Sequence, residues 1–83
     1  MYRAKITVTL RKSILDPQGK AVEQSIHSLG YGTVENVRIG KFIELTVDTK
    51  SREEAERLTN DVCRKLLANP VMEDFSFVVE EED

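Results

Sequence analysis

Two residues of types that often perform chemistry stand on predicted helices, His27 and Cys63. A general base needs a hydrogen-bonding partner, and an activated thiol needs a base or a lowered pKa; neither is visible in the sequence around these positions. One histidine and one cysteine also cannot supply the ligands of a structural zinc site. We therefore interpret His27 as a residue at the surface or the core boundary and Cys63 as a small hydrophobic residue, and we predict no catalytic, cofactor-binding or metal site in this chain.

Two segments could instead contact an anion. Asp16-Pro17-Gln18-Gly19 opens a predicted helix, where backbone N–H groups can hold a phosphate, but a phosphate loop needs more than one glycine, and a carboxylate already occupies the cap. Helix initiation is the stronger interpretation. Arg38, Gly40 and Lys41 lie in a predicted hairpin turn, and we interpret the two cations there as solvated.

Length and charge narrow the class of protein. The chain has 83 residues, one cysteine and a net charge of −3. Nucleic-acid binding normally needs a basic face, and no apolar run approaches the roughly 20 residues that span a bilayer, so we expect neither nucleic-acid nor membrane partners. The first residues enter an alternating pattern without a signal-peptide stretch, so we expect a cytoplasmic protein. A domain this small, without disulfide or metal, gains stability chiefly by association.

Hydrophobic periodicity predicts six elements. Apolar residues alternate over 2–11, and again over 34–39, 43–47 and 71–79, which predicts four strands. Helical spacing of Val22, Ile26 and Leu29 predicts a helix over 17–29 that Gly30 terminates. A second helix begins with the capping box of Ser51 and ends before Pro70, with the apolar stripe Ala55, Leu58, Val62 and Leu66.

The order strand–helix–strand–strand–helix–strand favours one α+β domain over residues 1–83. We predict a ferredoxin-like βαββαβ two-layer sandwich, with a four-stranded antiparallel sheet, both helices on one face and the first and third strands central. The acidic end, Glu80-Glu81-Glu82-Asp83, is interpreted as a solvated, frayed tail.

The second face of the first strand is a candidate surface for self-association. It carries basic residues and threonines that the helices cannot cover, and such a face either stays wet or pairs with another sheet. The pattern alone does not decide between these. Its residues are Arg3, Lys5, Thr7, Thr9 and Arg11.

Three segments together resemble the family of the small S subunit of phosphoribosylformylglycinamidine synthase. They are residues 12–19 (KSILDPQG), 37–41 (VRIGK) and 66–73 (LLANPVME), and the likeness extends over essentially the whole chain. The resemblance implies a non-catalytic subunit of an ATP-dependent, glutamine-using ligase of purine biosynthesis. It implies that ATP, Mg and glutamine are used by the partners, a large synthetase subunit and a glutaminase subunit, and that no cofactor binds this chain.

The same resemblance implies a homodimer, or a tetramer, that docks the two partners together and supports ammonia transfer between them. The exposed loops are then candidates for partner contact, through Asp16, Pro17, Gln18, Gly19, Arg38, Gly40 and Lys41. The alternative function is a regulatory module of ferredoxin-like topology that binds a small ligand, which a shift in melting temperature on ligand addition would reveal.

Overall fold

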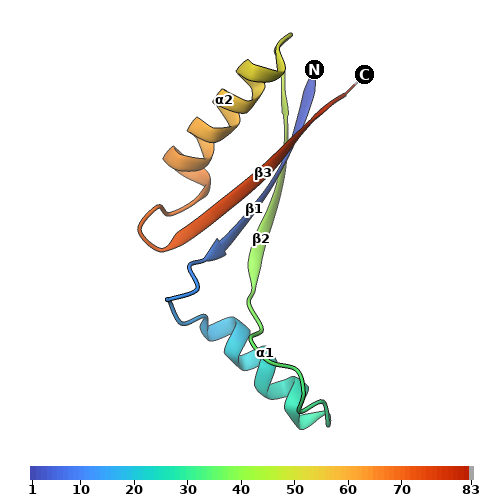
Figure 1. The fold of residues 1–83 in the computed structure, drawn as a ribbon, viewed down its shortest axis with the longest axis vertical. Coiled ribbons are helices and arrows are strands. Elements are labelled where there is room, and N and C mark those ends of the chain that lie inside the picture. Colours follow the sequence, from blue (N-terminus) through green and yellow to red (C-terminus); the bar gives the residue numbers. More distant parts are fainter. Residues whose placement is uncertain (83) are drawn as a thin grey trace.

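The computed structural model describes residues 1–82 and is of the α+β class. Its elements are β1 (Tyr2–Leu10), α1 (Pro17–Ser28), β2 (Gly40–Val47), α2 (Arg52–Val62), a π-helical turn (Cys63–Leu67) and β3 (Glu73–Glu81) (Figure 1). Both predicted helices and three of the four predicted strands are therefore present. Asp83, the last residue of the predicted acidic tail, lies outside the described residues.

The predicted four-stranded sheet is wrong. The sheet has three antiparallel strands in the order β2-β1-β3, so β1 is central and β2, which was expected beside it in the centre, is an edge strand. Tyr2 lies opposite Val47 on one side and Glu81 on the other. Gly40 and Lys41, expected in a hairpin turn, are the first two residues of β2.

Residues 34–39 form no strand because side chains bind backbone groups that a strand would offer to a neighbour. Glu23 Oε1 accepts the N–H of Val37 at 3.1 Å, and Asp16 Oδ2 accepts the N–H of Ile39 at 2.7 Å. Asn36 has a φ of 58°, in the left-handed region that interrupts extended backbone. Segment 34–39 is therefore tied to α1 and its cap instead of extending the sheet.

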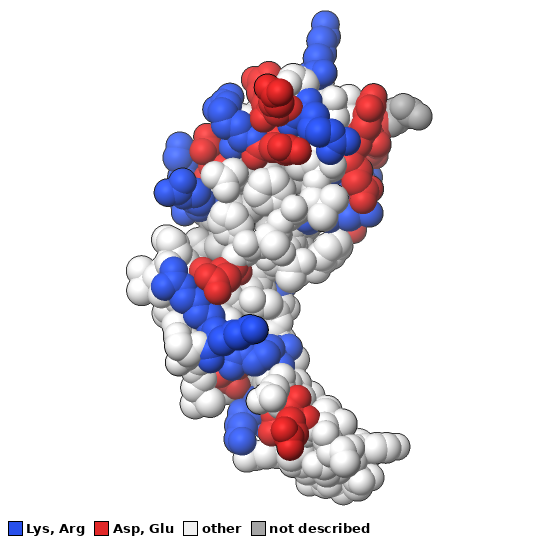
Figure 2. Space-filling view, in the orientation of Figure 1, with Lys and Arg blue, Asp and Glu red and all other residues white. Residues whose placement is uncertain are grey.

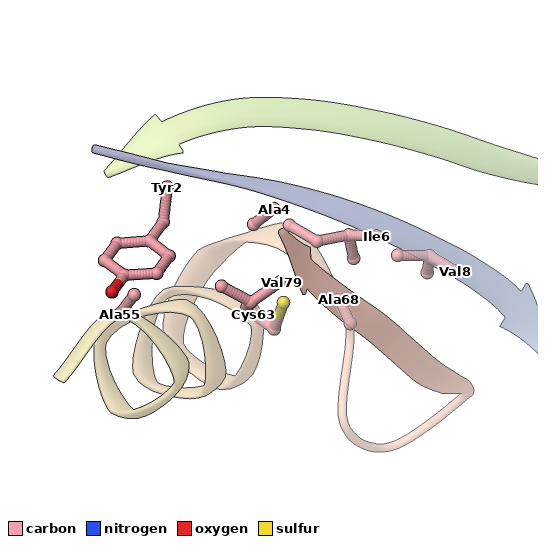
Figure 3. Close-up of a cluster of buried hydrophobic side chains, with 8 residues drawn as sticks. All are labelled: Tyr2, Ala4, Ile6, Val8, Ala55, Cys63, Ala68 and Val79. Carbon is pink, nitrogen blue, oxygen red and sulfur yellow. The ribbon is translucent and has the colours of Figure 1, made fainter. Parts of the chain in front are cut away.

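The core lies between one face of the sheet and α2 (Figure 3). Alternate β1 residues point into it, which confirms the predicted period of two, and Ile6 and Val8 are fully buried. Phe75 and Phe77 pack against the same cluster with ring centroids 6.3 Å apart. The buried hydrophobic residues are Tyr2, Ala4, Ile6, Val8, Ala55, Cys63, Ala68 and Val79.

The buried stripe of α2 begins at Ala55, as predicted, but continues one position away from the predicted residues, with Thr59 and Cys63 in place of Leu58 and Val62. Ala55, Thr59 and Cys63 face the sheet and are buried, whereas Leu66 is 77% exposed. Ala, Thr and Cys are small, which lets the helix backbone lie close to the strands, and the larger residues Leu58 and Val62 fall at the margin. After Val62 the helix widens into the π turn, where the N–H of Ala68 bonds the carbonyl of Cys63 at 2.9 Å.

Helix α1 does not cover the sheet, contrary to the prediction that both helices share one face. Figure 1 shows it beyond the end of the strands, and Gly19 is its one buried residue. The radius of gyration is 16.3 Å, whereas a compact chain of this length has about 12 Å. The molecule is thin and elongated, with extents of 51 × 29 × 14 Å.

Candidate functional sites: the joint of α1 and two uncovered surfaces

The predicted partner-contact segment 16–19 forms a joint between α1 and the start of β2. Asp16 is 4% exposed; its Oδ1 accepts the N–H of Gly19 at 3.1 Å, as a helix cap does, and its Oδ2 accepts from Ile39. These hydrogen bonds lower the pKa of the Asp16 carboxyl below its usual value, and the bond from Ile39 has the largest effect. One side chain therefore begins the helix and fixes the strand that follows it.

Arg38 holds the other half of this joint. Its Nη2 donates to the carbonyl oxygens of Arg11 and Ile14, both at 2.8 Å, and of Leu10 at 3.4 Å. The guanidinium thereby binds the backbone between β1 and α1, a role that periodicity could not indicate. Arg38 is exposed, but the interpretation of it as a solvated cation did not include these three hydrogen bonds.

The remaining predicted contact residues fall into two groups. Gly19 and Gly40 lie at close backbone approaches: a Cβ on Gly19 would stand 2.2 Å from the Val37 carbonyl oxygen, and one on Gly40 would stand 2.6 Å from that of Val8. Pro17, Gln18 and Lys41 are exposed. The structure brings all of these residues to one region, the junction of α1 with the sheet.

The open face of the sheet carries the predicted self-association residues among acidic partners. Arg3 bonds Glu44 at 2.7 Å and Glu82 at 2.9 Å, and Lys5 lies 3.3 Å from Glu80. The hydrogen bonds of Arg3, first to Glu82 and then to Glu44, raise the pKa of its guanidinium, and the hydrogen bond with Arg3 lowers the pKa of the Glu82 carboxyl. Glu82 is therefore bound to the sheet, and the prediction of a frayed end is wrong for it and for the β3 residues 80 and 81.

The middle of this face is less charged. Thr7 lies between Phe42 on β2 and Ser76 on β3, and Lys5 lies between Glu44 and Val78. Phe42 and Val78 are 61% and 59% exposed. Opposite-charge pairs thus border a centre in which Phe42 and Val78 lie beside Thr7 and Ser76. The sequence pattern did not predict this arrangement, because it depends on the register of the strands. At the other end of β1, Arg11 Nε is 3.4 Å from Asp74 Oδ1.

Helix α1 offers a second uncovered surface. Val22 is 39% exposed and Leu29 is 75% exposed, and Ile26 is half-buried. The following loop adds Tyr31 at 62% exposure. The helix is amphipathic as predicted, but no other element of the described chain covers its apolar side.

Reactive groups are few in the part of the chain that the structure describes. Cys63 is buried, and burial raises the pKa of its thiol, which opposes a nucleophilic role. His27 is exposed, as predicted, with Nε2 2.7 Å from the carbonyl oxygen of Val34. Within residues 1–82, no group of three His, Cys, Asp or Glu side chains is placed to hold a metal, and no helix is long and apolar enough to cross a membrane.

These features define a small α+β protein whose described surfaces are suited to binding other proteins. Residues 3–81 match the family model for PurS, phosphoribosylformylglycinamidine (FGAM) synthase. The chain belongs to this family, which confirms the predicted resemblance.

Relatives resemble it over most of their length. The FGAM synthase subunit PurS of Bacillus subtilis is 49% identical over 98% of this chain and 95% of that protein, and its counterpart from Synechocystis is 45% identical over 94% and 78%. The crystal structure of Methanocaldococcus jannaschii PurS superposes with a TM-score of 0.88 at 31% identity, covering both chains fully. A chain in the structure of PurLQS from Thermotoga maritima superposes with a TM-score of 0.87 at 29% identity, covering 95% of this chain and 96% of that one.

Proposed function

We propose that this chain self-associates and links the glutaminase and synthetase subunits of FGAM synthase, without catalysing a step itself. As a PurS-family member it is a subunit of that enzyme, which belongs to purine biosynthesis. In this proposal the partners use ATP, Mg and glutamine, and the enzyme is cytoplasmic. The similarity to a chain of the Thermotoga maritima PurLQS assembly supports a role within a complex.

The open shape of the single chain is the observation that carries the proposal. A compact protein of 9.5 kDa exposes about 5,000 Å² of surface, whereas this chain exposes 6104 Å². The excess is about 1,000 Å², close to the roughly 800 Å² that each partner contributes to a stable interface. A chain that leaves this much surface uncovered is suited to burying it against other chains.

A second copy is the partner that we propose for α1. The helix stands away from the sheet of its own chain. Its apolar residues Val22 and Ile26 and its cap residue Leu29 need a cover that the described chain does not provide. The open sheet face, with Phe42 and Val78 at its centre, is a further self-association surface, and using both would make a tetramer. The exposed residues Pro17, Gln18 and Lys41 stay candidates for contact with the other subunits.

Coupling of two active sites is the task that such a bridge would perform. Ammonia released by a glutaminase is protonated and diluted if it escapes into water, so its transfer requires that the two catalytic subunits be held together. A bridging domain needs shape and stability for this task and no acid or base of its own. The buried thiol of Cys63 agrees with that requirement.

Reconstitution tests the proposal. The synthetase and glutaminase subunits from the same source are assayed for amidine synthesis with and without this chain, once with glutamine and once with ammonium salt. We expect the glutamine-dependent activity to require the chain and the ammonium-dependent activity to be independent of it. If the chain changes neither activity, and size measurements show no complex, the proposed function is wrong.

A further inference from the structure

We propose that the end of α2 and the turn before β3, residues 64–72, form a docking surface for an acidic and partly apolar segment of another subunit. The inference rests on the proposed function and extends it to residues 64–72, a surface to which the proposed function assigns no contact. We call this surface the α2–β3 tip. It differs from the α1 joint and from the open sheet face in the elements that form it.

Exposed apolar side chains are concentrated at the α2–β3 tip. Leu66 is 77% exposed and Val71 is 75% exposed, and Met72 beside it is 42% exposed. Elsewhere in the described part of the chain, Leu29, the cap residue after α1, is 75% exposed and Leu15, before α1, is 70% exposed. Exposed apolar groups that gather in one short connection indicate a surface that another protein covers.

Positive charge accompanies these side chains. Arg64 and Lys65 are exposed, and within residues 1–82 neither forms an ion pair. The acidic neighbours already have partners, since Asp61 lies 3.6 Å from Arg57 and Asp74 lies 3.4 Å from Arg11. Basic side chains gather at the left edge of the molecule in Figure 2, over the end of α2. A basic surface on a chain of net charge −3 is complementary to an acidic partner.

The surface is hollowed on two sides of Arg64 and Pro70, which line both depressions. One, of about 380 Å³, is also lined by Arg11, Ala68 and Phe75 and by the carboxylates Glu73 and Asp74. The other, of about 340 Å³, is completed by Asp61 and Lys65. The carboxylates at these rims already have partners: Glu73 lies 3.8 Å from Lys41, and Asp74 and Asp61 form the pairs given above. The two depressions can therefore receive apolar side chains of a segment whose carboxylates meet Arg64 and Lys65.

Hydrogen bonds fix the turn that presents Val71. Asn69 Oδ1 accepts the N–H of Val71 at 3.0 Å, and Glu73 Oε1 accepts the N–H of Asn69 at 2.7 Å. The N–H of Arg11 bonds the Met72 carbonyl at 2.9 Å, and the Arg11 guanidinium donates to the Pro70 carbonyl. A turn bound to β1 in this way loses little entropy when a partner covers it, which favours affinity.

Other subunits are favoured over a second copy as the occupant. A second copy would present the carboxylates of its open sheet face, but Glu44 and Glu80 there are already paired with Arg3 and Lys5. A different protein is free to supply unpaired carboxylates. Electrostatic attraction at this surface also speeds the encounter of the subunits and makes it sensitive to salt.

A matched pair of charge reversals tests the α2–β3 tip. Lys65→Glu changes its charge, and Lys50→Glu makes the same change at an exposed lysine just before α2, at the opposite end of that helix. Binding of each variant to the purified synthetase subunit and to the purified glutaminase subunit is measured at low and at moderate salt. Circular dichroism confirms that each variant is folded, and sedimentation of each variant alone reports self-association.

We expect Lys65→Glu to weaken binding to one of the two subunits about tenfold and to reduce its salt dependence, and Lys50→Glu to change the dissociation constant less than twofold. Val71→Ser, which removes an apolar contact without changing charge, should weaken the same interaction. Equal affinities for both charge variants would overturn the inference, and a change of self-association in Lys65→Glu would assign the surface to a second copy instead. If the unmodified chain binds neither subunit, the proposed function itself fails, so the two failures are distinguishable.

Discussion

At the scale of single residues, Asp16 has the widest structural effect. Its carboxylate accepts one N–H from α1 and one from Ile39, just before β2, and it is almost completely buried. A carboxylate that accepts two backbone hydrogen bonds has a lower pKa in the folded state than in the unfolded state. Its contribution to stability is therefore present above the unfolded pKa, near 3.8, and is lost as the pH falls through the lower folded pKa.

We expect Asp16→Asn to lower the melting temperature near neutral pH and to flatten its dependence on pH. Asparagine has one acceptor oxygen, so one of the two N–H groups loses its partner. Thermal unfolding of both proteins is measured at about pH 6 and at about pH 3. We expect the melting temperature to fall more between these two pH values in the unmodified chain than in the variant. The same decrease in both proteins would show that Asp16 contributes nothing to the acid sensitivity.

At the scale of the elements, the position of α1 depends on a close backbone approach. Gly19 is buried against the carbonyl of Val37, and a Cβ there would lie 2.2 Å from that oxygen, well inside van der Waals contact. The helix and the segment before β2 can lie together only because residue 19 has no side chain.

Gly19→Ala should therefore destabilise the protein by about 1–3 kcal/mol, although alanine is the better helix former. Gly32→Ala is the matched control, because a Cβ at Gly32 meets no atom within 4 Å, and we expect a change below about 0.5 kcal/mol. Chemical denaturation of the two variants measures the difference. Equal stabilities would mean that α1 is free to move away from residue 37.

At the scale of the whole molecule, the uncovered surface predicts self-association. We expect the free chain to sediment at twice the monomer mass of 9.5 kDa or more. Leu29→Glu places a charge on the apolar side of α1, where Leu29 is 75% exposed, and should shift the chain towards monomer without loss of helix.

Leu66→Glu is the control for this shift. Leu66 is 77% exposed on the α2–β3 tip, which we assign to another subunit, so the same substitution there should leave sedimentation unchanged. A shift in both variants, or in neither, would contradict the assignment of α1 to self-association. Analytical ultracentrifugation at several concentrations distinguishes these outcomes, since dimerisation depends on concentration.

Local sequence was sufficient for the individual elements. Alternation in β1 predicted its buried face because side chains of a strand point to opposite sides, and Asp16 and Ser51 predicted the beginnings of the two helices because their oxygens accept N–H groups of the first turn. The three segments 12–19, 37–41 and 66–73 carried the resemblance to the family whose model matches the chain.

Tertiary structure decided what those elements do together. The pattern of residues 34–39 was that of a strand, but the side chains of Glu23 and Asp16, distant in sequence, take the N–H groups of Val37 and Ile39. The apolar stripe of α1 could not reveal whether it packs on its own sheet, because periodicity reports that a face is apolar and not which chain covers it. The sequence likewise could not predict the α2–β3 tip or the ion pairs of the open face. Both depend on how the elements are placed in space and on the strand register, which long-range contacts determine.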